Sequence, residues 1–229
     1  MPSFSSTIYL ILATVSFGSM SISTSFPVSV LTFINIFLKK MTLPPGLVLI
    51  KDFITKEEHD GLISFLDNNL WHGCGVEPNE ELKRRTQQYG ALFRFKTRKI
   101  EQIWSIPEEF DFFKNKFKLI DIFQKVPFDH IMVNEYQKYQ GIMPHIDSTV
   151  VFGDTIACLS LLSDCVMNFK SIKDDEKWDV YLPKRSLIIF QGESRFNITH
   201  SISKNDFDEI GDLLIERKRR ISLTFRTIK

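Results

Sequence analysis

Two pairs of polar residues, each separated by one position, lie on either side of a Gly-x-x-Pro turn in the middle of the chain. The first pair is Asn134 and Tyr136, and the second is His145 and Asp147. In a β-strand, residues i and i+2 point to the same face, so each pair can be aimed at one point. An imidazole and a carboxylate are two of the three ligands of a facial triad, in which two His and one carboxylate hold Fe(II). The spacing therefore indicates a candidate metal site that still needs a second imidazole.

Four other histidines could supply that imidazole, and we select His200. It begins a short apolar strand, HSIS, that follows the hydrophobic segment RSLIIF. His59 is expected on a solvent-facing helix surface, and His72 falls in the Gly-rich loop WHGCG. His130 opens a strand, where a structural role is expected.

The segment RISLTFR near the C-terminus alternates polar and apolar residues over seven positions. Arg220, Ser222, Thr224 and Arg226 share the polar face. Taken alone, this pattern is typical of an amphipathic edge strand with its polar face in solvent. If the face instead lines a barrel interior, its two guanidinium groups need anions, and arginine suits a bidentate grip on carboxylates. A small dicarboxylic acid would satisfy both arginines.

These motifs need a scaffold, and the rest of the sequence predicts helices followed by strands. With 229 residues and an ordinary apolar content, the chain can form one domain with a substantial core. Thr55 and Glu58 form the capping box of one predicted helix, and a second helix is expected after Pro107. Beyond Pro127 the period shortens to two over six strand-like segments. We therefore predict an α+β fold, a β-sandwich or jelly roll with flanking N-terminal helices.

The charge and cysteine content narrow the functional classes. A net charge of +1 gives no global attraction to nucleic acid or to an anionic membrane, so any such contact must come from local patches. The three cysteines, Cys74, Cys158 and Cys165, have unrelated spacings that fit neither a disulfide framework nor a zinc motif. We expect a reducing compartment.

Residues 1–38 carry no charge and hold two apolar runs, IYLILATVSF and FPVSVLTFINIFL. Neither run reaches the roughly 20 residues that a spanning helix needs, and the basic region of a signal peptide is missing. We expect residues 1–40 to be an apolar leader, either a membrane anchor or the product of a misassigned start that places the true beginning at Met41. In an anchor, Lys39 and Lys40 would hold the following domain, residues 41–229, in the cytoplasm.

The order NEY, HID, a distant His and RISLTFR resembles the AlkB family of Fe(II)- and 2-oxoglutarate-dependent dioxygenases. The resemblance runs from about Pro44 to Ile228. The segments VNEYQKYQGIMPHID, SLIIFQGESRFNITHSI and RRISLTFR are most similar to the AlkB domain of the tRNA wobble-uridine hydroxylase branch. The resemblance implies a double-stranded β-helix, also called a jelly roll, that holds iron in its mouth. It also implies an enzyme with Fe(II) and 2-oxoglutarate as cofactors and dioxygen as a further reactant.

The resemblance implies a role for each motif residue. Arg220 would pair with the distal carboxylate of 2-oxoglutarate, and Arg226 would lie near its metal-bound end. The iron ligands would be His145, Asp147 and His200. Contacts to the cosubstrate would also come from Asn134, Tyr136 and Ser222.

The segment KRRTQQYG, residues 83–90, is the densest basic and aromatic patch before these motifs. In the family this region forms a lid, so the resemblance implies substrate contacts from Arg84, Arg85, Gln87 and Tyr89. The alternative is a charged, solvated hairpin. Enzymes that act on a base take it out of the stack, and single-stranded RNA loops offer their bases at low cost. We expect an RNA substrate, specifically a modified uridine at the wobble position of a tRNA anticodon.

Other functions stay open. An oxidative demethylase of N-alkylated bases in DNA or RNA would use the same chemistry and release formaldehyde. A non-catalytic jelly-roll binding module would keep only the shape of the pocket, although all three ligands and both arginines are present. Oxidation of a protein side chain is a further alternative. For the hydroxylase we expect a monomer located in the cytoplasm, the nucleus or both.

Overall fold

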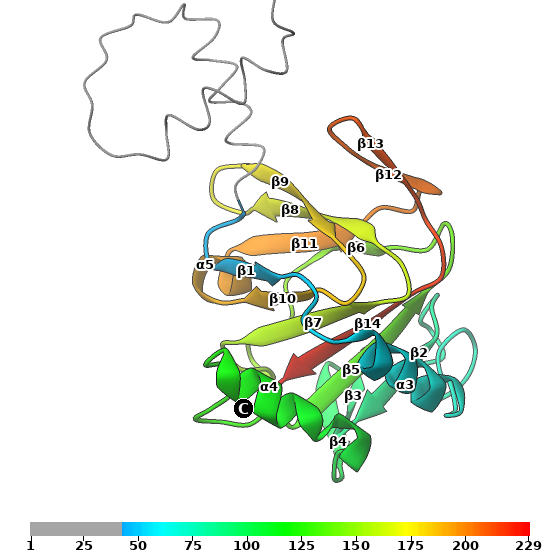
Figure 1. Ribbon diagram of the computed structural model, residues 1–229. Coiled ribbons are helices and arrows are strands. Elements are labelled where there is room, and N and C mark those ends of the chain that lie inside the picture. Colours follow the sequence, from blue (N-terminus) through cyan, green and yellow to red (C-terminus); the bar gives the residue numbers. More distant parts are fainter. Residues whose placement is uncertain (1–42) are drawn as a thin grey trace, which may run out of the picture. The chain divides into compact units, whose positions relative to one another are not determined.

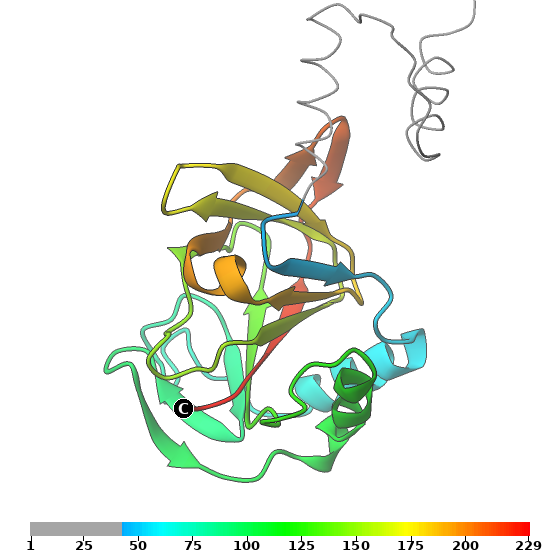
Figure 2. The same cartoon turned by 90° about the vertical axis from the view of Figure 1, so that its left-hand side faces the viewer.

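Two antiparallel sheets make up most of the described part of the chain, and Figures 1 and 2 show them from two directions. The computed structural model describes residues 43–229, so the predicted leader, residues 1–40, lies outside the described residues. Within residues 43–229, none of the helices combines the length and the apolar character that crossing a membrane would require.

The larger sheet has six strands in the order β1, β10, β7, β14, β5, β2, and all neighbouring strands are antiparallel. Its strands are β1 (Leu47–Ile50), β2 (Thr86–Tyr89), β5 (His130–Tyr136), β7 (Ile156–Leu161), β10 (Leu187–Phe190) and β14 (Arg220–Arg226). Strand β14, which carries both motif arginines, lies between β5 and β7 and is buried along its whole length. The interpretation of this segment as an edge strand in solvent is therefore wrong.

The smaller sheet has four strands in the order β6, β11, β8, β9 and packs over one face of the larger sheet (Figure 1). Its strands are β6 (Ile142–His145), β8 (Cys165–Ser171), β9 (Lys177–Leu182) and β11 (Ile198–Ile202). Side chains of both sheets meet in one hydrophobic cluster, to which the larger sheet contributes Cys158 and Ile188 and the smaller sheet Met167 and Phe169. Two such sheets enclosing a core form a jelly roll, which confirms the predicted fold class.

Helices cover the other face of the larger sheet (Figure 1). They are α3 (Lys56–Asp67), the short 3₁₀ helix η1 (Glu108–Phe110) and α4 (Phe112–Leu119). Helix α3 begins at the predicted capping box, since Thr55 Oγ1 accepts the Glu58 N–H at 3.2 Å and Glu58 Oε2 accepts the Thr55 N–H at 2.8 Å. These reciprocal bonds satisfy two backbone donors that the first turn leaves free.

Phenylalanine side chains join helix α4 to the larger sheet. The ring centroids of Phe113 and Phe117 lie 4.6 Å and 5.0 Å from that of Phe225 on β14. Ile221 and Leu223 belong to the same buried cluster. Because side chains alternate along a strand, the apolar positions of β14 face the helices and the polar positions face the space between the sheets.

Two hairpins and one short helix complete the described fold. The hairpins are β3 (Ala91–Arg94) with β4 (Lys99–Ile103), and β12 (Phe207–Ile210) with β13 (Leu213–Glu216). Helix α5 (Gly192–Phe196) leads directly into β11.

Candidate active site

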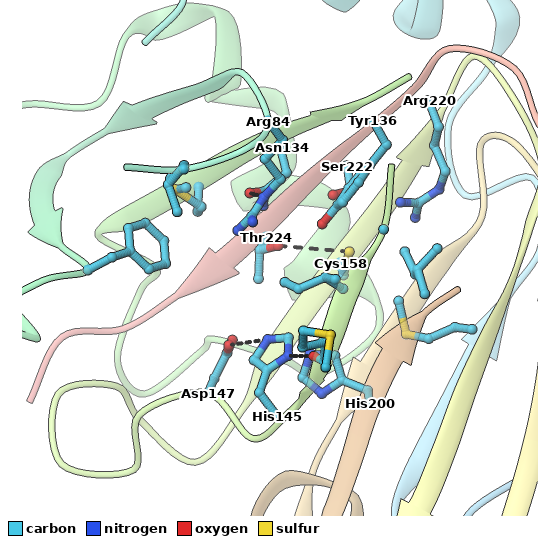
Figure 3. A pocket seen from close by; sticks show the side chains of 18 of the residues that line it. Arg84, Asn134, Tyr136, His145, Asp147, Cys158, His200, Arg220, Ser222 and Thr224 are labelled. Carbon is cyan, nitrogen blue, oxygen red and sulfur yellow. Dashed lines mark hydrogen bonds and ion pairs between the residues drawn. The ribbon is translucent and has the colours of Figure 1, made fainter. Parts of the chain in front are cut away.

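Three potential metal ligands converge on one point beside the smaller sheet. His145 is the last residue of β6, Asp147 follows two positions later, and His200 lies on β11. His145 and His200 are direct cross-strand partners, and their ring centroids are 4.3 Å apart. The ligand atoms of the three side chains all lie within 4.8 Å of one another (Figure 3). Two imidazoles and one carboxylate at this spacing are the donor set that suits a non-haem Fe(II) ion.

A backbone contact fixes the tautomer of His145. Its Nδ1 lies 2.8 Å from the carbonyl oxygen of Met143, so the Nδ1–H donates there. The lone pair is then on Nε2, which lies 3.6 Å from Asp147 Oδ1. The nitrogen that faces the carboxylate is therefore the one free to bind a metal.

The surroundings of Asp147 and His200 favour the metal-binding form of each side chain. Burial alone would raise the pKa of Asp147, but Arg226, whose Nη2 is 2.8 Å from Asp147 Oδ2, and the contact with His145 hold that pKa well below its usual range. Burial, reinforced by His145, lowers the pKa of His200 to about 3. Asp147 is therefore ionised and His200 neutral at physiological pH, as metal binding requires.

Arg195 on helix α5 holds the loop that follows Asp147. This guanidinium is 2 % exposed and donates to backbone carbonyl oxygens only. The acceptors, at 2.9–3.2 Å, are the carbonyls of Asp147, Ser148, Phe152 and Gly153. Because Arg195 precedes His200 by five positions, one side chain links the elements that carry two of the three ligands. Sequence reasoning missed it, since a single arginine in the polar run GESRFN gives no pattern.

Arg220 is a buried cation with unused donors. Its side chain is 1 % exposed, and its Nη2 donates to Ser160 Oγ at 2.8 Å. Its Nε and Nη1 are buried without any hydrogen-bond partner. A buried guanidinium with two free donors is costly unless an anion completes it. The arrangement therefore fits a carboxylate of a bound ligand.

A cavity of about 440 Å³ joins the metal ligands to Arg220. The predicted cosubstrate residues of the larger sheet all line it, namely Asn134 and Tyr136 on β5 and Arg220, Ser222 and Arg226 on β14. Tyr136 pairs with Arg220 and Asn134 pairs with Ser222 across the two strands. Figure 3 shows Asn134, Tyr136, Arg220 and Ser222 on one side of the cavity and His145, Asp147 and His200 on the other. The candidate site thus has two halves, a metal half beside the smaller sheet and a carboxylate-binding half on the larger sheet.

Comparison with known proteins decides the family. A model of the 2OG-Fe(II) oxygenase superfamily matches residues 46–226. The chain belongs to this superfamily. The dioxygenase has an AlkB-like domain and uses Fe(II) and 2-oxoglutarate, which confirms the predicted enzyme class and cofactors.

Several relatives of the dioxygenase have AlkB-related names. An Arabidopsis thaliana protein named "Alkylated DNA repair protein ALKBH8 homolog" is 32 % identical over 81 % of this chain and 59 % of its own length. A Macaca fascicularis protein named "tRNA (carboxymethyluridine(34)-5-O)-methyltransferase ALKBH8" is 33 % identical over 84 % of this chain and 32 % of its own length. The dioxygenase therefore spans between a third and three fifths of these relatives. The match to the solved structure of OsALKBH1 spans 82 % of this chain and 99 % of that chain, with a TM-score of 0.59. Because the two sequences are 22 % identical, this match shows the fold alone.

Of the four residues expected to contact substrate, the structure brings only Arg84 to the cavity. Arg84 and Arg85 precede β2, and their side chains contact adjacent residues of β5, Asn134 and Glu135, whose side chains point to opposite faces of the sheet. Arg85 donates to both carboxylate oxygens of Glu135, at 2.5 Å and 2.6 Å, on the other face of the sheet. The side chains of the remaining two residues, Gln87 and Tyr89, are buried beneath helix α3 and η1.

This placement corrects the expectation for Arg85, Gln87 and Tyr89. Gln87 Nε2 donates to the Leu66 carbonyl at 2.8 Å, at the end of α3. The Tyr89 hydroxyl donates to Gln87 Oε1 at 2.9 Å, and its ring packs 4.9 Å from that of Phe110. These three side chains hold residues 85–89 to the helices and the larger sheet, and they do not line the cavity.

The histidines that were set aside have structural surroundings. His130 is fully buried, stacks on Phe152 at 5.3 Å, and burial lowers its pKa to about 3. The expectation that His59 faces solvent is wrong, because its Nε2 accepts the Leu162 N–H at 3.0 Å.

Proposed function

We propose that this dioxygenase hydroxylates a modified nucleobase, and specifically a uridine at the wobble position of a tRNA anticodon. The observation that carries the proposal is the joint position of His145, Asp147 and His200 beside a cavity that ends at Arg220. Fe(II) with 2-oxoglutarate and dioxygen supplies the oxidation of a C–H bond, with 2-oxoglutarate converted to succinate and carbon dioxide.

The residues of the carboxylate-binding half would orient the cosubstrate. Arg220 offers its two free donors to the distal carboxylate, and the Tyr136 ring lies 5.8 Å from the same guanidinium. Asn134 and Ser222 line the cavity on neighbouring strands and supply further polar groups. Arg226 is paired with Asp147 and would lie near the metal-bound end of the cosubstrate. The buried surroundings exclude water from these contacts and strengthen them.

The choice of a tRNA uridine rests on the relatives. The names of relatives from macaque, Xenopus tropicalis and mouse refer to position 34 carboxymethyluridine of tRNA, at 30–33 % identity. This chain aligns with only about a third of the length of each relative, so the complete activity of those proteins is not assigned to it. An anticodon loop also presents unstacked bases, which a pocket of this size can take up at low cost. Such a substrate would place the dioxygenase in the cytoplasm or the nucleus.

A second candidate is oxidative demethylation of an N-alkylated base. A Caenorhabditis elegans relative named "DNA N6-methyl adenine demethylase" is 27 % identical over 79 % of this chain. The same site would then hydroxylate an N-methyl carbon, and the product would lose formaldehyde.

The test incubates the full chain with Fe(II), ascorbate and 2-oxoglutarate against total tRNA and methylated oligonucleotides. Nucleosides are then profiled by mass, formaldehyde is measured, and Asp147→Ala serves as the inactive control. A uridine derivative heavier by about one oxygen atom supports the hydroxylase. Formaldehyde without such a nucleoside supports the demethylase. Succinate formation by Asp147→Ala equal to that of the unaltered chain would remove the proposed metal site.

A further inference from the structure

Arg84 places a cation in the cavity that the cosubstrate residues do not account for. It precedes β2, lines the cavity and is half-buried. Its Nε donates to Asn134 Oδ1 at 2.6 Å. Among residues 43–229, no carboxylate lies within ion-pair distance of its guanidinium, unlike Arg85, which is paired with Glu135. A partly buried guanidinium without a counter-ion is a binding group for an anion.

Aromatic rings hold this guanidinium in place. Its Cζ lies 5.9 Å from the ring centroid of Phe95 and 5.8 Å from that of Tyr136. Arg220 lies 5.8 Å from the same Tyr136 ring, and Figure 3 shows the two arginines on different sides of Tyr136. Because Tyr136 lies between the two guanidiniums, an anion bound by Arg84 would be distinct from the carboxylate expected at Arg220. The position of Arg84 is preorganised, so little side-chain entropy is lost when it binds.

The charges near Arg84 have the same sign. Lys83 and Lys204 also line the cavity, and neither has an ion-pair partner among the described residues. The only carboxylate in the cavity lining apart from Asp147 is Glu81. Three cations against one carboxylate favour an oxyanion and disfavour a base that is itself positively charged, such as a 1-methyladenine.

We propose that Arg84 is the receptor for an oxyanion of the substrate and that it selects against cationic bases. The oxyanion is either a carboxylate carried by the base or the phosphate of the target nucleotide. This inference rests on the proposed function, because it assumes that a nucleotide enters the cavity. It extends that function by assigning a residue that sets substrate specificity.

The test measures binding of labelled anticodon-loop oligoribonucleotides to the full chain by fluorescence anisotropy. The oligonucleotides differ at one position, which carries 5-carboxymethyluridine, 5-methyluridine or 1-methyladenosine. The variants are Arg84→Gln and Arg84→Lys, and Arg98→Gln is the matched control, since this exposed arginine does not line the cavity. Titration of 2-oxoglutarate into each variant checks the cosubstrate side, and thermal denaturation checks the fold.

If the base carries the oxyanion, Arg84→Gln weakens binding of the 5-carboxymethyluridine oligonucleotide about 10- to 100-fold, as expected for loss of a charge-assisted contact, and leaves 5-methyluridine unchanged. If the phosphate is the partner, all three weaken alike and the slope of log K against log salt falls by about 0.7. With a base carboxylate, 1-methyladenosine binds more tightly to Arg84→Gln than to the unaltered chain. Arg84→Lys should retain part of the affinity, because it keeps the positive charge. If Arg84→Gln does not fold, the loss of affinity in Arg84→Lys serves as the test.

Unchanged binding of all three oligonucleotides by Arg84→Gln overturns the inference. So does a loss of 2-oxoglutarate affinity that accounts for the whole effect, since Arg84 would then serve the cosubstrate. Failure of the proposed function is a different result, in which the unaltered chain neither binds RNA nor modifies any uridine.

Discussion

Replacing Arg220 with methionine is expected to stabilise the free protein and to abolish its response to 2-oxoglutarate. In the absence of ligand, Arg220 Nε and Nη1 are buried without partners. Each unsatisfied buried donor destabilises the unaltered protein by about 1–3 kcal/mol. Loss of the bond to Ser160 Oγ destabilises the variant by about 1 kcal/mol. Methionine fills much of the same volume without a charge. The free energy of unfolding of Arg220→Met should therefore rise by about 2 kcal/mol, or about 4–8 °C in Tm for a domain of this size.

Bound 2-oxoglutarate should make the unaltered protein more stable than Arg220→Met. At a 2-oxoglutarate concentration 100 times its Kd, binding stabilises the unaltered protein by about 2.7 kcal/mol. Arg220→Met loses the guanidinium contact, so the same concentration should leave its Tm unchanged.

The assay is thermal denaturation with and without 2-oxoglutarate, in the presence of Mn(II) as a redox-inert substitute for Fe(II). Arg98→Met, at an exposed position away from the cavity, is the control for loss of one arginine. The reasoning is refuted if Arg220→Met lowers the Tm of the ligand-free protein and 2-oxoglutarate still raises it.

Three further predictions concern Arg195, His130 and Arg85. Arg195→Met should weaken Mn(II) affinity about 10- to 100-fold, because Arg195 holds the backbone of the ligand Asp147. Electron paramagnetic resonance titration measures the affinity, and equal affinity of the two proteins would contradict this role of Arg195. His130 is neutral when folded, with a pKa of about 3 against 6.5 when unfolded, so its contribution to stability is complete above pH 6.5 and is lost as pH falls. When the pH is lowered from 7.5 to 5.5, the free energy of unfolding of His130→Asn, measured in urea, should therefore fall by about 1.4 kcal/mol less than that of the unaltered protein. An identical fall in the two proteins would contradict the lowered pKa of His130. Arg85→Ala should lower the stability by about 1–2 kcal/mol, because Arg85 is partly exposed and Glu135 keeps Arg219 as a partner, while RNA binding by anisotropy stays the same once the protein is folded.

The parts of the structure that local rules govern could be predicted from the sequence. The capping box at Thr55 and Glu58 depends on four consecutive residues, and helix α3 begins there. The period-two segments after Pro127 became strands for the same reason, since alternation is a local property. His200 was selected to join His145 because it begins a short apolar strand, HSIS, and the structure makes the two histidines cross-strand partners.

Features that depend on which layer covers a strand could not be predicted. The alternation in β14 is the same whether its polar face meets solvent or a cavity, and only the neighbouring strands β5 and β7 decide it. For Arg85, Gln87 and Tyr89, composition indicated a basic and aromatic patch, but the face on which each side chain lies depends on the pairing of β2 with β5. The hairpin of β12 and β13 was not expected, because its strands mix acidic and apolar residues in a short run.

The reaction centre is divided between two sheets, and the gap between them sets the distance over which the two reactants meet. His145 and His200 lie on strands of the smaller sheet, whereas Arg220 lies on a strand of the larger one. The spacing of the sheets is maintained by core side chains such as Cys158 and Met167, which belong to one hydrophobic cluster formed by both sheets. A change of one methylene in that core would displace the metal relative to its cosubstrate without altering any residue that touches either of them. Core substitutions between the sheets should therefore affect turnover of the cosubstrate as well as folding.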